Sequence, residues 1–513
     1  MVQQGAPAPT HHDPGSMISA AALRRDLFIF ADDSMRGRET GTADARRAAT
    51  FLARRVQHLG LEPAGDSLYL QRVPLIRETF ARTTQMTVTS ATGQKQNLRL
   101  GVDLTPVASL GSDGPPVSRT AEGDIIFVGN GPKSNNEALA LLPLNLDGKV
   151  LVTVVHVPPG APIAERRAMD TLMVSRLARL LSFRPSALVL LMSGAMEDEY
   201  QRQLPGMLRN IELDGPEPAD SGKHFPMLLI GSAKRGSPLL PANWPNDVSP
   251  QKLNRQFSGR FDLDRTRLTG YNVVAVVRGL DPKLNKTYLA YGAHYDHIGI
   301  LPLAARGHQR ADSIANGADD DGSGSVALLA IAQQMMIYRP RRSVLFVWHV
   351  GEEKGLLGSK FFTSHPSVPI DSIVAQFNAD MIGRNESNTV GLVGPRAAPN
   401  YLSWRLGMIV DSVNRTLETP FRIERKWDDP DDPEHIYQRS DHYNYAKKGI
   451  PIIFFTAGEH EDYHRVTDEA SKIDYDKLAR VTQLMLESGL VVSNRSVRPT
   501  SEAITQSISS PQP

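Results

Sequence analysis

Cysteine is absent from the 513 residues of the sequence. This absence excludes disulfides, thiol nucleophiles and thiolate-ligated metal sites, and it leaves carboxylate and imidazole groups as the candidate metal ligands. It fits a compartment in which free thiols are a liability, although many cytosolic proteins share the property. Because the Gln/Ala/Pro-rich start also resembles the mature end of an exported protein whose leader was removed, we expect a secreted or periplasmic protein.

Long apolar runs and a strong charge of either sign are also missing. No uninterrupted apolar stretch approaches the length of a membrane span, so no membrane span is expected. The formal net charge is +1, and charged residues make up 22% of the chain. This near balance gives no electrostatic reason to expect nucleic acid or a charged membrane surface as a partner. The composition is that of an ordinary soluble protein, and it leaves the oligomeric state open.

The pattern along the sequence divides the chain into five segments. We expect a flexible segment at 1–17, the first part of a main domain at 18–105, an inserted β-rich module at 106–254, the second part of the main domain at 255–496 and a disordered tail at 497–513. Short β-rich runs between Gly/Pro turns, around one expected helix at Ala164–Ser182, indicate the insertion. A chain of this length has room for two or three domains, each with its own core.

Strands and helices alternate in the second part of the main domain. Their apolar periodicities predict helix Ser323–Tyr338, strand Ser343–Val350, strand Ile373–Ala379, helix Tyr401–Leu417, strand Ile450–Thr456 and a helix from about Asp474 to Val492. An amphipathic helix is also predicted earlier, in ARRAATFLARRVQHLG. Alternating strands and helices are typical of an α/β sandwich around a largely parallel sheet.

Side chains that bind metals lie at or after the predicted strand ends. They are His294, Asp296, the aspartates at 319–321, Glu352, Glu353, Asp380 and His464. Taken singly, each has a structural alternative, since aspartates cap helices and glutamates favour the first turn of a helix. Open α/β sheets bind ligands at the carboxyl ends of their strands. Together in one domain, these residues predict a zinc-type site in which two cations share a bridging carboxylate.

Two glutamates stand side by side in VWHVGEEKGLLGS, directly after a predicted buried strand. Two carboxylates a few ångströms apart disfavour each other's ionisation, and a cation between them removes that objection. Neighbouring side chains at a strand end point in different directions. One glutamate can therefore bind a cation while the other faces a water molecule.

With these motifs in order, the sequence resembles the di-zinc metallopeptidases of family 28, which include secreted bacterial aminopeptidases and glutamate carboxypeptidases. The resemblance rests on GAHYDHIG, NGADDDGSGS, GEEKGLLGS, NADMIGR, RSDHYNYAKKGIPIIFF and DYHRVTDE, and on an amino-terminal segment that contains MRGRETGT. It implies a three-layer α/β/α zinc-exopeptidase fold with a mixed, largely parallel central sheet. The inserted module resembles a protease-associated (PA) domain, on GDIIFVGNG and LDGKVLVT.

The resemblance also implies the ligands of two zinc ions per chain. His294 and Asp380 would hold one zinc, Glu353 and His464 would hold the other, and Asp320 would bridge the two. Three carboxylates and two neutral imidazoles would leave about one net positive charge on such a centre, so its electrophilic character would be retained.

The same resemblance assigns roles to two residues that do not bind the metals, and a third candidate, Tyr463, follows from its place beside His464 in the sequence. Glu352 would act as the general base, and Asp296 would accept the far ring N–H of His294 and fix its orientation. Tyr463 is a candidate donor to the developing oxyanion, and a packed aromatic with a satisfied hydroxyl is the alternative.

Our leading interpretation is a zinc-dependent aminopeptidase that acts on peptides with a free amino terminus. The runner-up is a carboxypeptidase or dipeptidase for acidic substrates, for which Arg384 and Arg439 are possible carboxylate-binding groups. A glutaminyl-cyclase-like transferase typically works with a single zinc, which the full set of ligands argues against. A non-catalytic binding module on the peptidase fold would have no reason to keep Glu352 beside the metals.

Overall fold

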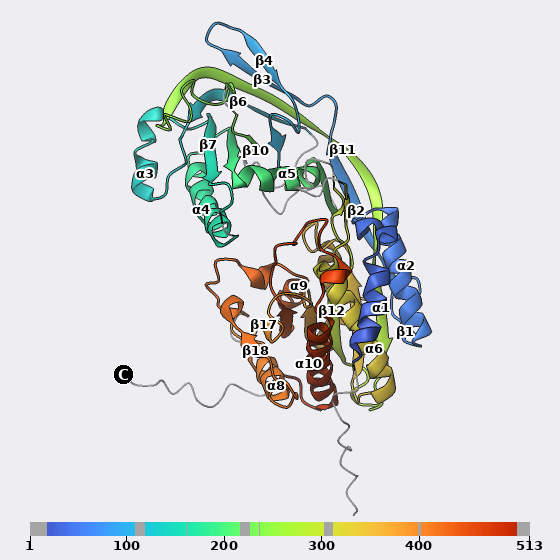
Figure 1. Cartoon of the computed structure of the whole chain (residues 1–513). Coiled ribbons are helices and arrows are strands. Elements are labelled where there is room, and N and C mark those ends of the chain that lie inside the picture. Colours follow the sequence, from blue (N-terminus) through green and yellow to red (C-terminus); the bar gives the residue numbers. More distant parts are fainter. Residues whose placement is uncertain are drawn as a thin grey trace, which may run out of the picture. The chain divides into compact units, whose positions relative to one another are not determined.

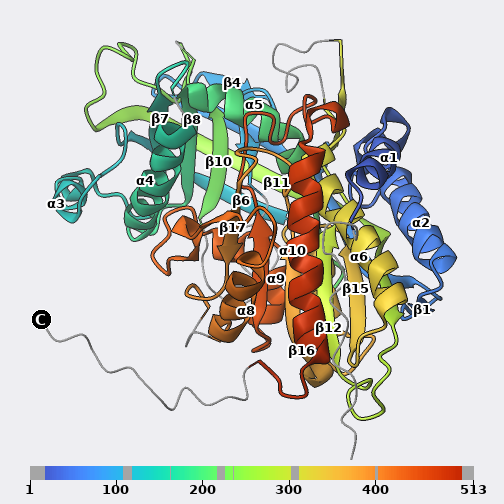
Figure 2. The same cartoon turned by 60° about the horizontal axis from the view of Figure 1, so that its bottom comes forward.

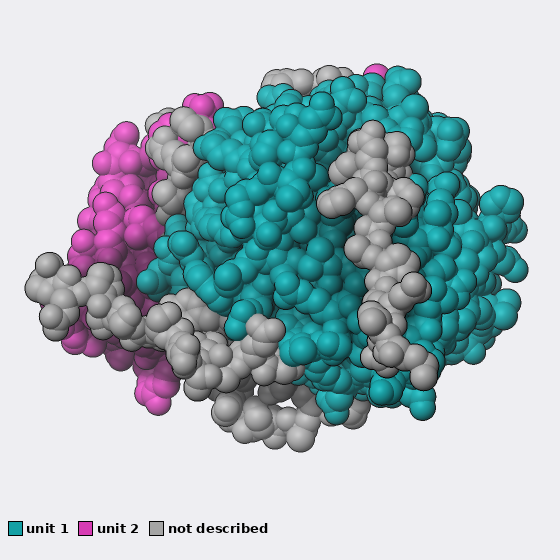
Figure 3. Space-filling view, turned by 90° about the horizontal axis from the view of Figure 1, so that it is seen from below, with its two compact units in different colours: residues 1–73, 269–300, 314–513 teal, residues 74–268, 301–313 magenta. Residues whose placement is uncertain are grey.

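The structure is a computed structural model that describes residues 18–107, 118–161, 163–215, 226–234, 236–301, 311–398 and 402–499 (Figure 1). The segment expected to be flexible, 1–17, and most of the expected tail, 497–513, lie outside the described residues. The chain forms two compact units (Figure 3). The first contains residues 1–73, 269–300 and 314–513, and the second contains residues 74–268 and 301–313.

Four adjacent parallel strands form the centre of the sheet in the first unit. In spatial order they are β15 (Ser343–His349), β12 (Tyr288–His294), β16 (Ile373–Ala379) and β19 (Ile452–Thr456). Antiparallel neighbours flank them, because β15 pairs with residues 273–277 of β11 (Gln251–Val277) and β19 pairs with β17 (Thr389–Val393). A short strand, β18 (Arg422–Glu424), runs parallel to β17. The largely parallel α/β sheet expected from the sequence is confirmed.

Side chains of β12 point alternately to the two faces of this sheet, and helices pack on both faces. Tyr288 and Ala290 belong to a buried cluster with Phe362 and Tyr445, which lie on α7 (Leu357–Ser364) and α9 (His442–Ala446). Tyr291 points to the other face, where its hydroxyl donates to the backbone oxygen of Met485, 2.9 Å away. Successive side chains of a strand point to opposite faces, so the sheet forms the middle of three layers.

The second helical layer contains the helices near both ends of the described chain (Figure 2). It comprises α1 (Ala20–Phe30), α2 (Ala43–His58), α6 (Gly324–Tyr338), α8 (Trp404–Asn414) and α10 (Tyr475–Asn494). The hydroxyl of Thr42 accepts the backbone N–H of Ala45 and caps α2, while the carboxylate of Asp474 accepts that of Lys477 and caps α10. These helices confirm the predicted elements to within a few residues, as expected where caps and periodicity agree.

The second unit also has a parallel sheet with helices, built from β6 (Ser118–Phe127), β7 (Val150–Val157), β8 (Ala187–Gly194) and β10 (Met227–Ser232). Its helix α4 (Ile163–Leu181) matches the expected one, but α5 (Ala195–Leu208) was not predicted. The polar sequence of α5, with Pro205 and Gly206 in its last turn, hides its helical period. The PA-domain assignment of the inserted module stays a prediction.

Among the described residues, no helix combines the length and the apolar composition that crossing a bilayer requires.

Candidate metal centre

The candidate ligands come together at the carboxyl edge of the parallel strands. His294 is the last residue of β12, and Asp380 directly follows β16. Glu352 and Glu353 follow the end of β15. Asp320 lies in the helical turn η5 (Ala318–Ser323) that precedes α6. Because parallel strands end at the same edge of a sheet, residues far apart in sequence meet here.

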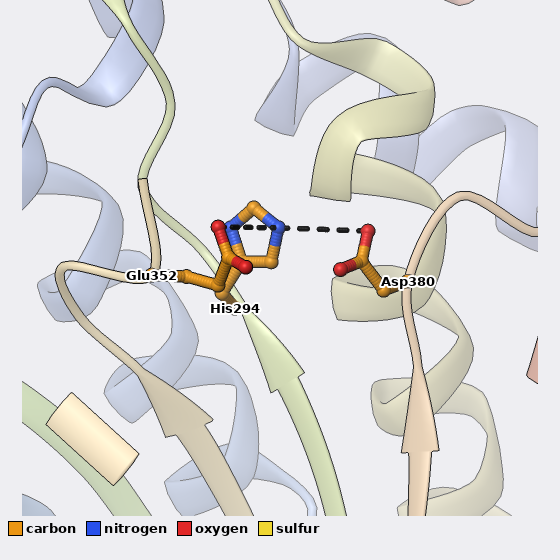
Figure 4. Close-up of side chains that lie close together, drawn as sticks. All are labelled: His294, Glu352 and Asp380. Carbon is orange, nitrogen blue, oxygen red and sulfur yellow. Dashed lines mark ion pairs between the residues drawn. The ribbon is translucent and has the colours of Figure 1, made fainter. Parts of the chain in front are cut away.

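One ligand group forms around His294. Its Nε2 atom lies 3.2 Å from Oδ1 of Asp320, 3.6 Å from Oδ1 of Asp380 and 3.9 Å from Oε2 of Glu352. Figure 4 shows the side chains of His294, Glu352 and Asp380 pointing toward a common centre, from the ends of three strands. The ligand atoms of these three residues lie within 4.8 Å of one another, which is compact enough to hold one cation.

A second ligand group forms around Glu353 and shares Asp320 with the first. Nε2 of His464 lies 2.9 Å from Oε2 of Glu353 and 3.3 Å from Oδ2 of Asp320. Nδ1 of His297 lies 2.7 Å from Oε1 of Glu353 and 3.7 Å from Oδ2 of Asp320. The two oxygens of Asp320 thus face different groups, as a bridging carboxylate requires.

His297 is a candidate that the sequence analysis missed. It is fully buried and belongs to the compact group formed with Asp320 and Glu353. The signal was present in GAHYDHIG, where a second histidine follows His294 after two residues. A histidine near a strand end is most often structural, and only the contact with Glu353 distinguishes this one.

Unpartnered polar atoms show that these groups fit cations. Among the buried side-chain atoms without a hydrogen-bond partner are Nε2 of His294, Nε2 of His464 and Oδ2 of Asp320. Leaving such atoms buried and unsatisfied costs free energy. Imidazole nitrogens and carboxylate oxygens at these distances are the donor set that zinc takes when thiolates are absent.

The two adjacent glutamates have opposite pKa shifts. Burial, together with the charges of Asp380 and Glu353, raises the pKa of Glu352 well above its usual value, against the attraction of His294. Burial acts in the same direction on Glu353, but His464 and His297 overcome it and lower its pKa. One glutamate is therefore held as a carboxylate between two imidazoles, while its neighbour is the more basic group, which suits a proton acceptor.

The imidazoles record the same excess of negative charge. Burial disfavours the charged ring of His294, but Glu352 and Asp380 raise its pKa well above the usual value. The pKa of His464 is raised in the same way, against burial, by Glu353 and Asp320. Without cations, the centre attracts protons, and cations of higher charge would replace them.

Asp296 and Tyr463 lie beside the ligands. Nδ1 of His294 is 3.1 Å from the backbone oxygen of Asp296 and 3.8 Å from its carboxylate Oδ1. That carboxylate instead accepts a hydrogen bond of 2.5 Å from the hydroxyl of Thr40. The ring of Tyr463 stacks on His464 with 3.9 Å between centroids. The expected roles of Asp296 and Tyr463 stay predictions.

A pocket opens from Asp320, Glu352 and Asp380. Its wall contains the ring of Tyr463 and a pair of charged side chains, Arg439 and Glu459, whose Nη2 and Oε1 atoms are 2.7 Å apart. The rest of its lining is mostly apolar and includes Met381, Trp427, Ile436 and Phe454. Two short 3₁₀ turns, η8 (Lys426–Asp428) and η9 (Ile436–Gln438), supply Trp427 and Ile436.

The fold and the two ligand groups define an α/β protein with a candidate two-metal centre at the carboxyl edge of its sheet. Residues 272–489, which contain every candidate ligand, match the model of peptidase family M28. This match confirms, for this segment, the resemblance noted in the sequence.

Relatives with curated names are similar over less than half of the chain. A probable leucine aminopeptidase of Trichophyton verrucosum is 29% identical over 220 residues, which are 41% of this chain and 55% of that protein. Aminopeptidase Y of Saccharomyces cerevisiae is 26% identical over 260 residues, which are 46% of this chain and 42% of that protein. The chain thus spans about half the length of the curated relatives it matches.

Solved structures are similar over nearly the whole chain. An aminopeptidase from Aneurinibacillus sp. strain AM-1 has a TM-score of 0.56 and 17% identity, over 95% of this chain and 97% of that one. A zinc aminopeptidase from Bacillus subtilis has a TM-score of 0.52 and 15% identity, over 94% of this chain and 97% of that one. At these identities the likeness shows a common fold.

Proposed function

We propose that the chain is a zinc-dependent aminopeptidase that removes residues from the amino end of peptides. The observation that carries the proposal is the pair of ligand groups that share Asp320, with Glu352 beside them. His294 and Asp380 would hold one zinc, and Glu353 and His464 the other. The names of the relatives, leucine aminopeptidase and zinc aminopeptidase, support the same activity.

Zinc held by these residues would supply Lewis-acid polarisation of the scissile carbonyl and would lower the pKa of a bound water. Glu352 accepts the proton of the attacking water and returns it to the departing amine. The hydroxyl of Tyr463, at the pocket wall, donates to the carbonyl oxygen as negative charge develops there.

The pocket favours the amino end of a substrate over the carboxyl end. A carboxypeptidase needs a cation that binds the terminal carboxylate, and the two candidates already face carboxylates. Nη2 of Arg384 lies 2.9 Å from Oδ2 of Asp462, and Arg439 is paired with Glu459. The apolar side of the pocket instead suits an uncharged, bulky side chain of the residue that is removed.

The test is a mass-spectrometric digest of one peptide with an amino-terminal leucine in three forms: free, amino-acetylated and carboxyl-amidated. Each is run with the untreated chain, with a chelator, and after restoration of zinc. We expect stepwise loss from the amino end that acetylation blocks, amidation leaves intact and zinc restores. Loss of residues from the carboxyl end, blocked by amidation, would support a carboxypeptidase instead. If no form is cleaved although two zincs are bound, a non-catalytic binding module becomes the better interpretation.

We also propose that the protein works outside the cytoplasm and that residues 106–254 form a PA-like insertion. The complete absence of cysteine supports the first proposal, and fractionation of the source cells tests it. The parallel sheet and helix α4 lie within the range of the proposed insertion. Residues 74–268 of the second compact unit contain the proposed insertion. Expressing them separately and testing for cooperative unfolding examines whether this part of the chain folds on its own.

A further inference from the structure

A turn near the amino end of the described chain reaches the candidate metal centre, although it lies outside the segment that matches the family. The turn is η2 (Asp33–Arg38). At its Gly37, φ is +67°, and an added Cβ atom would lie 2.5 Å from the backbone oxygen of Ala315 and 2.6 Å from that of Gly299. Only glycine allows the turn to approach so closely the two paired strands that carry these atoms, β13 (Gly299–Ile300) and β14 (Ile314–Ala315).

Arg38, the last residue of the turn, is fully buried and binds backbone rather than a carboxylate. Its Nε donates to the oxygen of Tyr295 at 2.7 Å, and its Nη1 donates to those of Asn316 at 2.6 Å and Phe30 at 3.2 Å. Its Nη2 donates to the oxygen of Gly317 at 2.8 Å. A single planar guanidinium thus joins the loop after His294 to the loop before Asp320.

Thr40 extends these contacts to the third loop of the centre. Its hydroxyl donates to Oδ2 of Asp296 at 2.5 Å, while Oδ1 of Asp296 accepts the backbone N–H of Glu352 at 3.3 Å. The carboxylate of Asp296 therefore lies between the amino-terminal segment and the loop that carries both glutamates. The backbone oxygen of Arg38 also accepts the N–H of His297, at 3.4 Å.

The charge of Arg38 suits this position. Burial lowers its pKa to about 10, so the guanidinium stays charged at neutral pH. Asp468, Asp296 and Asp320 attract it through space, and it forms no ion pair with a carboxylate in the described part of the chain. A lysine here would keep the charge, but it could not hold four backbone oxygens in one plane.

From this geometry we infer that Arg38 and Thr40 are positioning residues of the metal centre, and that the segment Gly37–Thr40 is a required part of the active site. Arg38 fixes the spacing of the loops that carry His294 and Asp320, and Thr40 fixes the carboxylate of Asp296. The inference rests on the proposed function, because it assumes that the two ligand groups bind zinc. Outer contacts of this kind typically change metal affinity ten- to a hundredfold when removed.

The experiment measures zinc affinity and stoichiometry in four variants of the full chain. R38K removes the planar donors, and R55K makes the same chemical change at Arg55, which pairs with Asp26 on the α1–α2 helices. T40V removes the hydroxyl with little change of shape, and T40S restores it. Affinity is measured by competition with a chromophoric chelator, stoichiometry by elemental analysis, and folding by the thermal midpoint of the metal-free chain.

We expect R38K and T40V to bind zinc at least ten times more weakly than the wild type, with T40S and R55K within twofold of it. The metal-free midpoints of T40V and T40S should agree, which separates positioning from a general loss of stability. If R38K does not fold, the T40V–T40S pair decides the question alone.

If T40V binds zinc with the affinity of the wild type, the role of Thr40 is overturned. If R38K does so, the role of Arg38 is overturned. These results leave the proposed function intact, provided that the wild type binds two zincs. A wild-type chain that binds no zinc would overturn the proposed function, and this inference with it.

Discussion

Replacing each of the adjacent glutamates with glutamine should give opposite results, and this pair of variants tests the proposed division of roles. Both changes keep the shape of the side chain and remove its charge. If Glu352 is the base and Glu353 a ligand, E352Q keeps two zincs and loses turnover. E353Q instead loses the second zinc.

The distances support this difference. Nε2 of His294 lies closer to Asp320 and Asp380, at 3.2 and 3.6 Å, than to Glu352, at 3.9 Å. The first zinc therefore retains three protein donors when Glu352 is neutral. Glu353, in contrast, lies between the imidazoles of His297 and His464 at 2.7 and 2.9 Å. Its replacement removes the anionic donor at the centre of the second group.

The expected magnitude for E352Q follows from its role as a base. A general base contributes about 10²- to 10⁴-fold in rate, which corresponds to about 3 to 5 kcal/mol of transition-state stabilisation. We expect kcat to fall by that factor while KM changes less than about threefold, because the apolar pocket is untouched. Turnover of an amino-acid p-nitroanilide at saturating zinc, combined with elemental analysis, measures both quantities.

The reasoning would be refuted by the exchanged pattern, in which E352Q loses a zinc and E353Q keeps both. Such a result would place Glu352 among the ligands of the first cation, a position that its 3.9 Å distance from His294 allows. Retention of full turnover by E352Q would remove the base from the mechanism altogether.

Three further predictions concern the surroundings of the centre and the core. H297Q should lower the affinity for the second zinc about tenfold or more, because it removes the 2.7 Å contact with Glu353. H365Q, the same change at an exposed site, should leave that affinity unchanged. Equal zinc affinities of the two variants would contradict the prediction. G489A should lower the thermal midpoint, because the added Cβ would lie 1.7 Å from the hydroxyl of Tyr291. Overpacking costs about 1–3 kcal/mol, whereas the alanine gains about 1 kcal/mol of helix propensity. An unchanged or higher midpoint would show that the core relaxes around the added methyl group. Burial lowers the pKa of Lys477 to about 8, so the unfolded chain binds more protons than the folded chain between pH 8 and about 10.5. The free energy of unfolding should therefore rise across that window, by at most about 3 kcal/mol. Chemical denaturation should show that K477M lacks this rise, and parallel pH curves for the two proteins would refute the prediction.

The sequence predicted the parts of the site that attach directly to regular elements. His294 and Asp380 terminate or follow apolar strands, and the strand period locates them without knowledge of the fold. The same signal locates Glu352 and Glu353, since only Val350 and Gly351 separate them from the end of β15. Their close approach across the sheet edge follows from parallel pairing alone.

Residues that reach the site through long-range contacts carry no such local signal. Trp427 lines the pocket from a loop, and its indole fits only because Gly391 and Gly458 leave room for it. A Cβ atom would lie 2.7 Å from the ring at Gly391 and 2.3 Å from it at Gly458. Each glycine by itself indicates a turn, and nothing in the spacing links the three positions. Arg38 was hidden for the same reason, because its four partners are backbone oxygens of distant loops.

Charge connects the candidate centre with the fold around it. Without cations, the pKa values of Glu352, His294 and His464 are raised. Protons bound by these groups would offset the repulsion among the buried carboxylates. Two zinc ions would supply that positive charge in fixed positions and release the protons, so metal affinity and proton binding must be coupled. The guanidinium of Arg38 offsets part of the same repulsion from behind the loops. The amino-terminal segment thus contributes charge and geometry to a centre whose ligands all lie in the second half of the chain.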